Sequence, residues 1–193
     1  MASIYGIQLK KVKKTYGIEG VGFQTDLYMD GKKVGYAADY ADGSMLNVHV
    51  ENAVLVARVR QYYAENPKED FLTTYSNIKS AKDYIALKNE GKLPVMDYSK
   101  LSDGEILEDF CNELYFLHMH ERTFKRAIRQ DWKAIIVTDY KSIKGVPTPL
   151  DQIYYTNGSA SAFESVKKAA EKKCTAVELK QYRSLNDFVI PMP

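Results

Sequence analysis

The sequence predicts an α+β fold, with an N-terminal three-stranded antiparallel meander, a helical middle containing one long central helix, and a C-terminal β-β-α-β segment. Three observations predict this class. Apolar and polar residues alternate over 23–50, which is typical of strands. Apolar residues recur every three or four positions over 102–132, which indicates a helix. Short strand-like runs then return after residue 133.

The N-terminal sheet is predicted from alternation and from turn residues. A first strand is expected over 4–16, with a bulge near Lys10 because Val12 falls out of the alternation. The meander follows, and Asp30-Gly31 is a strong signal for a two-residue hairpin. Its three strands are predicted over 23–29, 34–40 and 46–50. Glycine-rich turns separate the strands over 17–22 and at Asp42-Gly43.

Two helices are predicted between the meander and the central helix. The segment 52–65 fits a helix, although Val54, Val56 and Val59 would also suit a strand. Its length and the following Asn66-Pro67 favour the helix. A shorter helix is expected over 77–90.

The central helix is predicted to begin at Ser102, because Ser102 and Glu105 have the spacing of a capping box. Its apolar face is predicted to consist of Ile106, Phe110, Leu114, Leu117, Phe124 and Ile128. Glu121 interrupts that face. We expect Glu121 to be at least partly buried, and hydrogen-bonded or ion-paired with Lys125 or with a residue distant in sequence.

Charge is segregated along this helix. The acidic residues of its first half are Asp103, Glu105, Glu108, Asp109 and Glu113. The basic residues of its second half are Arg122, Lys125, Arg126 and Arg129. One interpretation is that this order complements the helix macrodipole on a solvated face. The other is that the four basic residues, within an arc of about 100°, bind phosphate or an acidic protein.

The C-terminal part is predicted to contain a loop over 144–149, a helix over 159–173, and strands over 134–137, 152–156 and 175–179. The loop that leads into the helix has the chemistry of an anion site, because serine hydroxyls and free backbone N–H groups meet at a helix N-terminus. Its residues are Asn157, Gly158, Ser159 and Ser161. An ordinary turn and helix cap is the alternative, with Ser161 and Glu164 as a capping box.

Length and composition indicate a single α+β domain over 1–193, with a subdivision near 66–100 as the alternative. The net charge of +2 argues against a dedicated non-specific DNA binder. No segment reaches the length of a membrane span and no signal peptide is evident, so the expected location is cytoplasmic. Cys111 and Cys174 lack metal-site and redox-pair spacing, and Cys111 is expected to be a reduced core residue.

The sequence contains no recognised catalytic motif, which favours a protein that is not an enzyme and has no cofactor. His118 and His120 are two positions apart and would point to opposite sides of a helix, so no metal site is expected. Cys111 and His118 would be two turns apart, too far for a nucleophile and its base. An enzyme whose site residues are scattered along the chain remains a third hypothesis.

The leading hypothesis is a non-enzymatic intracellular binding protein that contacts nucleic acid, or an acidic nucleoprotein surface, through the basic end of the central helix. The second hypothesis is an accessory inhibitor of the kind that phages and plasmids carry, which contacts a host defence complex through tyrosine anchors. Salt dependence separates the two, because phosphate contacts weaken steeply with salt and aromatic contacts much less.

Overall fold

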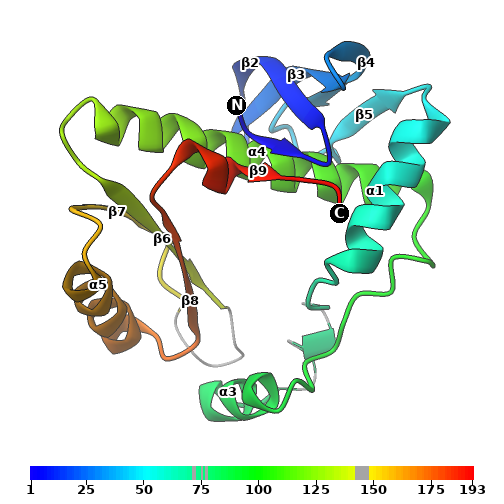
Figure 1. Cartoon of the computed structure of the whole chain (residues 1–193). Helices are drawn as coiled ribbons and strands as arrows, with labels where there is room; N and C mark the ends of the chain where they lie inside the picture. Colours follow the sequence, from blue (N-terminus) through cyan, green and yellow to red (C-terminus); the bar gives the residue numbers. More distant parts are fainter. Residues whose placement is uncertain (71–72, 75, 77, 142–147) are drawn as a thin grey trace. The chain divides into compact units, whose positions relative to one another are not determined.

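The computed structural model describes the chain except for residues 71–72, 75, 77 and 142–147. It confirms the α+β class, with antiparallel strands near the N-terminus, a long central helix, and strands with a helix near the C-terminus (Figure 1). The contacts divide the chain into two compact units. The first comprises Met1–Asn66, Asp97–Arg122 and Leu185–Pro193, and the second comprises Pro67–Met96 and Thr123–Ser184.

The sheet of the first unit has the strand order β5-β4-β3-β2-β1-β9. The pairs from β1 to β5 are antiparallel, as the sequence predicted for the meander. β9 pairs with β1 in parallel, through Ser3↔Val189 and Ile4↔Ile190, and the sequence did not predict this strand. The strands are β1 (Ser3–Ile4), β2 (Ile7–Gly17), β3 (Gly20–Met29), β4 (Lys32–Asp39), β5 (Asn47–Val50) and β9 (Val189–Ile190).

The predicted hairpin at Asp30-Gly31 is confirmed. Met29 pairs with Lys32, and both turn residues have positive φ, 49° for Asp30 and 82° for Gly31. This is the conformation of a type I′ turn, which matches the twist of the flanking strands. The bulge near Lys10 is also confirmed, because the register of β2 against β3 shifts between Lys10 and Lys13.

Replacing Gly31 by valine is expected to lower the free energy of unfolding by about 1–3 kcal/mol, because a β-branched residue is strained at this φ. A Cβ atom at this position would meet no other atom, so backbone strain is the expected cause. Gly104→Ala in the first turn of the central helix is the matched control, where alanine is expected to stabilise by up to about 1 kcal/mol. Urea denaturation measures both variants. Equal stability of the Gly31→Val variant and the wild type would contradict this account of the turn.

The ambiguous segment after the meander is helical. α1 (Ala53–Glu65) begins at Asn52, whose side chain accepts hydrogen bonds from the backbone N–H groups of Val54 and Leu55. Leu55, Val59, Tyr62 and Tyr63 are buried on one side of it. A strand would place successive residues on alternate faces, whereas these positions recur at helical spacing.

α4 (Asp103–Ile128) is the predicted central helix, and its capping box is confirmed. The Ser102 backbone N–H donates to Glu105 Oε2 at 2.8 Å, and the Glu105 N–H donates to Ser102 Oγ at 3.3 Å. The helix ends at Ile128, within the stretch 102–132 that was predicted to be mostly helical. Asp131 has a φ of 64°, and the N–H groups of Asp131 and Trp132 bind the last carbonyls in the manner of a Schellman motif.

The predicted apolar face of α4 is confirmed except at its end. Ile106, Phe110, Leu114, Leu117 and Phe124 are buried. Ile128 was predicted to be buried but is 47% exposed, and Ala127 is buried. A helix has about 3.6 residues per turn, so a stripe that advances by threes and fours drifts around the axis, and here it reaches Ala127.

The second unit contains a three-stranded antiparallel sheet with the order β7-β6-β8. Its elements are α3 (Ala81–Asn89), β6 (Ala134–Tyr140), β7 (Ile153–Thr156), α5 (Ala160–Lys173) and β8 (Val177–Tyr182). α3 begins later than predicted, because Ser80 is its N-cap; the predicted first residue, Asn77, lies outside the described residues. Most of the predicted loop over 144–149 also lies outside them. A buried cluster joins α3, β6 and α5 through Tyr84, Tyr140 and Ala170.

A short 3₁₀ helix, η1 (Leu185–Phe188), leads into β9 in the first unit. Phe188 at its end is buried. None of the helices in the described part of the chain is both long enough and apolar enough to cross a bilayer.

Candidate functional site

Three residues of the predicted basic patch, Arg122, Lys125 and Arg126, lie on the second half of α4, and Arg129 follows its last residue. Arg122, Arg126 and Arg129 are exposed and Lys125 is partly buried. The three arginines form no ion pair with any residue that the structure describes. Arg122 belongs to the first unit and the other three belong to the second.

The buried carboxylate of Glu121 fulfils its prediction. Its side chain is 1% exposed, and Oε2 accepts a hydrogen bond of 2.9 Å from the backbone N–H of Ala2. Oε1 lies 3.2 Å from the amino group of Met1. The partners are therefore distant in sequence, which was one of the two predicted alternatives. The apolar face of α4 is consequently placed correctly around Glu121.

The loop before α5 uses most of its polar groups internally. Ser159, and not Ser161, is the N-cap, because Ser159 Oγ accepts from the N–H of Ala162. The predicted capping box of Ser161 and Glu164 is therefore wrong. Gly158 has a φ of 77°, which turns the chain so that the helix starts two residues earlier than that box required. The N–H groups of Gly158 and Ser159 donate to Thr156 Oγ1 and Asn157 Oδ1.

These contacts bear on the predicted anion site. Ser161 Oγ lies 3.0 Å from Ser159 Oγ, so the two hydroxyls contact each other. The Asn157 and Ser159 oxygens accept from backbone N–H groups. A turn and cap accounts for this set of hydrogen bonds without a bound anion.

The two cysteines and the possible metal ligands do not form a reactive or metal-binding group among the described residues. Cys111 and Cys174 are free and buried. Burial raises the pKa of the Cys111 thiol to about 12, so the thiol carries its proton at neutral pH. Within the described ranges, no three His, Cys, Asp or Glu side chains gather in a way that could hold a metal ion.

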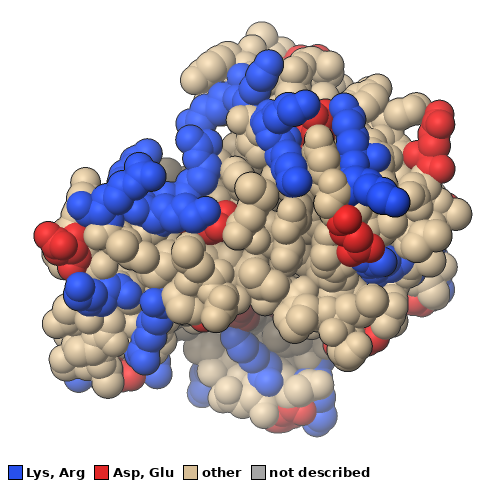
Figure 2. All heavy atoms as spheres, turned by 45° about the horizontal axis from the view of Figure 1, so that its top comes forward, with Lys and Arg blue, Asp and Glu red and all other residues tan. Residues whose placement is uncertain are grey.

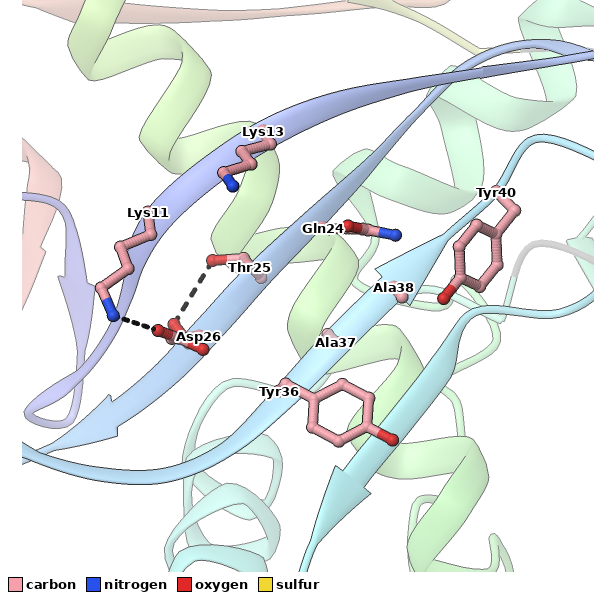
Figure 3. Close-up of a pocket in the computed structure, with 9 residues that line it drawn as sticks. All are labelled: Lys11, Lys13, Gln24, Thr25, Asp26, Tyr36, Ala37, Ala38 and Tyr40. Carbon is pink, nitrogen blue, oxygen red and sulfur yellow. Dashed lines mark hydrogen bonds and ion pairs between the residues drawn. The ribbon is translucent and has the colours of Figure 1, made fainter.

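A further candidate, which sequence analysis missed, is a pocket of about 270 Å³ on the outer face of the first unit's sheet. Figure 3 shows its residues on β2, β3 and β4. They are Lys11, Lys13, Gln24, Thr25, Asp26, Tyr36, Ala37, Ala38 and Tyr40. We call it the sheet-face pocket. Its strand pairing explains the gathering, because Lys13, Gln24 and Ala38 are register partners across three strands.

In the sheet-face pocket, Asp26 and Lys11 take part in ion pairs, whereas Lys13 does not pair with any described residue. Lys33 and Lys11 lie 2.5 and 3.0 Å from the Asp26 carboxylate, and these contacts lower its pKa below the ordinary value. Lys13 is exposed and has no ion-pair partner in the described part of the chain. Lys10, on the same strand, places its Nζ 4.2 Å from the centre of the Tyr28 ring. Figure 2 shows Lys and Arg side chains gathered over the N-terminal sheet, which comes forward in that view.

Two tyrosines line this pocket. Tyr36 of β4 and Tyr40, directly after β4, are 43% and 47% exposed, and both line the pocket. Tyr36 also stacks on His49 of β5, with ring centres 5.3 Å apart. The sequence showed the clustered lysines and the many tyrosines. It did not show that lysines of β2 lie opposite tyrosines of β4, because that depends on the strand register.

No protein-family model, curated protein or solved structure matches this chain.

Proposed function

We propose that the protein is a non-enzymatic nucleic-acid-binding protein whose contact surface includes the basic arc of α4. The observation that carries the proposal is that Arg122 and Arg126 of α4, and Arg129 directly after it, are exposed and form no ion pair with the described residues. An arginine that is not paired within the protein offers its planar donor fork to an external phosphate.

Stabilisation of the helix by its dipole explains the positions of only some of these basic residues. The macrodipole favours cations within the last turn of a helix, and Lys125 and Arg126 lie in that turn. Arg122 precedes that turn, where the dipole effect has fallen off. Its position beside Arg126, one turn on, is the arrangement that supports phosphate contacts along a strand of nucleic acid.

The test replaces Arg122, Lys125, Arg126 and Arg129 together by glutamine. We expect the variant to bind DNA and RNA more weakly, and the dependence of log K on log salt to become shallower by about 0.9 for each duplex phosphate that the variant no longer neutralises. Folding should be nearly unchanged, since exposed substitutions shift stability by about 0.5 kcal/mol or less each. Affinities at two salt concentrations, with circular dichroism as the folding check, measure this.

A matched control removes the same charge elsewhere, on exposed lysines of α3, α5 and the segment before α3: Lys79, Lys82, Lys168 and Lys172. We expect this control to bind with nearly the wild-type salt slope. Equally weakened binding in both variants would show that net charge, and not the α4 arc, governs binding.

A protein-contacting inhibitor is the second candidate, and the exposed tyrosines favour it. Tyr16, Tyr36 and Tyr40 are all exposed on the first unit's sheet, and exposed tyrosines serve protein contacts well. The same experiment separates the candidates. A wild-type protein that binds neither DNA nor RNA at low salt would leave this second candidate in place of the first.

A further inference from the structure

We propose that the sheet-face pocket binds one unpaired base of a single-stranded nucleic acid, with an adjoining phosphate on Lys13. This inference rests on the proposed function and adds a second surface to it, one that reads single strands. It is carried by three properties of the pocket: two exposed aromatic rings, polar groups on the neighbouring strand β3, and a lysine at the edge, Lys13, that has no ion-pair partner among the described residues.

The rings supply the stacking surface. Tyr36 lies on β4 and Tyr40 directly after its end, and Figure 3 shows both rings at the pocket with Ala37 and Ala38 between them. Alanine leaves space over this part of the sheet that a larger side chain would fill. Every base has a flat face that can stack on tyrosine, so such a surface holds bases with little sequence preference.

The groups between the rings and β2 can bind the edge of a base. Gln24 carries both donor and acceptor atoms, and it lies beside Ala38 in the strand register. Asp26 accepts from Lys11 and Lys33, and these cations keep its carboxylate ionised and fixed in place. An ionised carboxylate can accept from an N–H group at the edge of a base, such as the ring N3–H of thymine.

Lys13 is positioned for the phosphate. It pairs with Gln24 in the register, so its side chain leaves the sheet on the pocket side. Its neighbour Lys11 already pairs with Asp26 and is less available for an external anion. A phosphate bound by Lys13 would hold the backbone at the pocket edge while neighbouring bases stack on the tyrosine rings.

The pocket selects a single strand. At about 270 Å³ it is at the small end of ligand-binding cavities, which start near ~300 Å³, so it has room for one base-sized group. Bases inside a duplex have both faces stacked on their neighbours and cannot reach tyrosine rings on a protein surface. The bases of a DNA duplex therefore cannot stack on the tyrosine rings of this pocket.

The experiment compares oligothymidylate with a DNA duplex of equal length, for the wild type and for Tyr36→Ala, Tyr40→Ala, Tyr36→Phe and Lys13→Gln variants. We expect each alanine variant to bind oligothymidylate about 5- to 150-fold more weakly, with an unchanged salt slope. The phenylalanine variant should bind as the wild type does, because it keeps the ring. Lys13→Gln should make the salt slope shallower by about 0.7.

Tyr16→Ala is the matched control, because Tyr16 is exposed on the same sheet and does not line the pocket. Wild-type affinity for oligothymidylate in both alanine variants would overturn the inference while the proposed function, tested with the α4 variants, stands. The inference would also be overturned if the tyrosine variants lost affinity for the duplex as strongly as for oligothymidylate. Absence of any nucleic-acid binding by the wild type would overturn both, and tyrosine-dependent binding of polyglutamate alone would indicate an acidic protein ligand.

Discussion

Replacing Glu121 by alanine is expected to lower the free energy of unfolding by about 2–4 kcal/mol. The carboxylate is buried, and it accepts from the Ala2 N–H, which is itself buried. Alanine would leave this N–H without an acceptor, and an unsatisfied buried donor costs about 1–3 kcal/mol. The small side chain would also leave a cavity beside α4.

Thermal and urea denaturation measure this effect, and two further variants interpret it. Glu121→Gln keeps an acceptor of the same size, so we expect a smaller decrease in stability than alanine causes. Glu164→Ala removes an exposed carboxylate from α5 and should change stability by about 0.5 kcal/mol or less. If Glu121→Ala and Glu164→Ala were equally stable, the hydrogen bond to Ala2 would have no part in holding the N-terminal strand.

The parts of the fold that depend on neighbouring residues were predictable. Asp30-Gly31 forms its hairpin because both residues tolerate positive φ, and Ser102 with Glu105 closes its capping box within one helical turn. The burial of Glu121 followed from the 3.6-residue period alone. Its partner did not, since Ala2 is far away along the chain and no local pattern connects them.

Very short strands and the register between strands could not be predicted from the sequence. β9 has two residues, too few for a periodic signal, and it becomes a strand only because β1 offers an edge. The candidate surfaces differ in the same way. The basic arc of α4 follows from helical spacing, so its residues could be predicted. The sheet-face pocket joins Lys13 of β2 to Tyr36 of β4 through two strand pairings and a bulge, which only the folded chain determines.

Replacing Phe23 by alanine is expected to lower the free energy of unfolding by about 3–5 kcal/mol, the largest effect that we predict. Phe23 of β3 is buried on the inner face of the first unit's sheet. Its ring stacks on Tyr115 of α4, with centres 3.9 Å apart and planes within 6°. The substitution would remove this stacking and open a cavity between β3 and the helix.

Ile18→Ala is the matched control, because Ile18 lies in the turn of the same β2–β3 hairpin and is 91% exposed. It should change stability by about 0.5 kcal/mol or less. Gln24, the next residue after Phe23, faces the sheet-face pocket, so Phe23→Ala should also weaken oligothymidylate binding as β3 loses its support. Similar urea midpoints for the Phe23 and Ile18 variants would show that the packing of β3 on α4 does not stabilise this sheet.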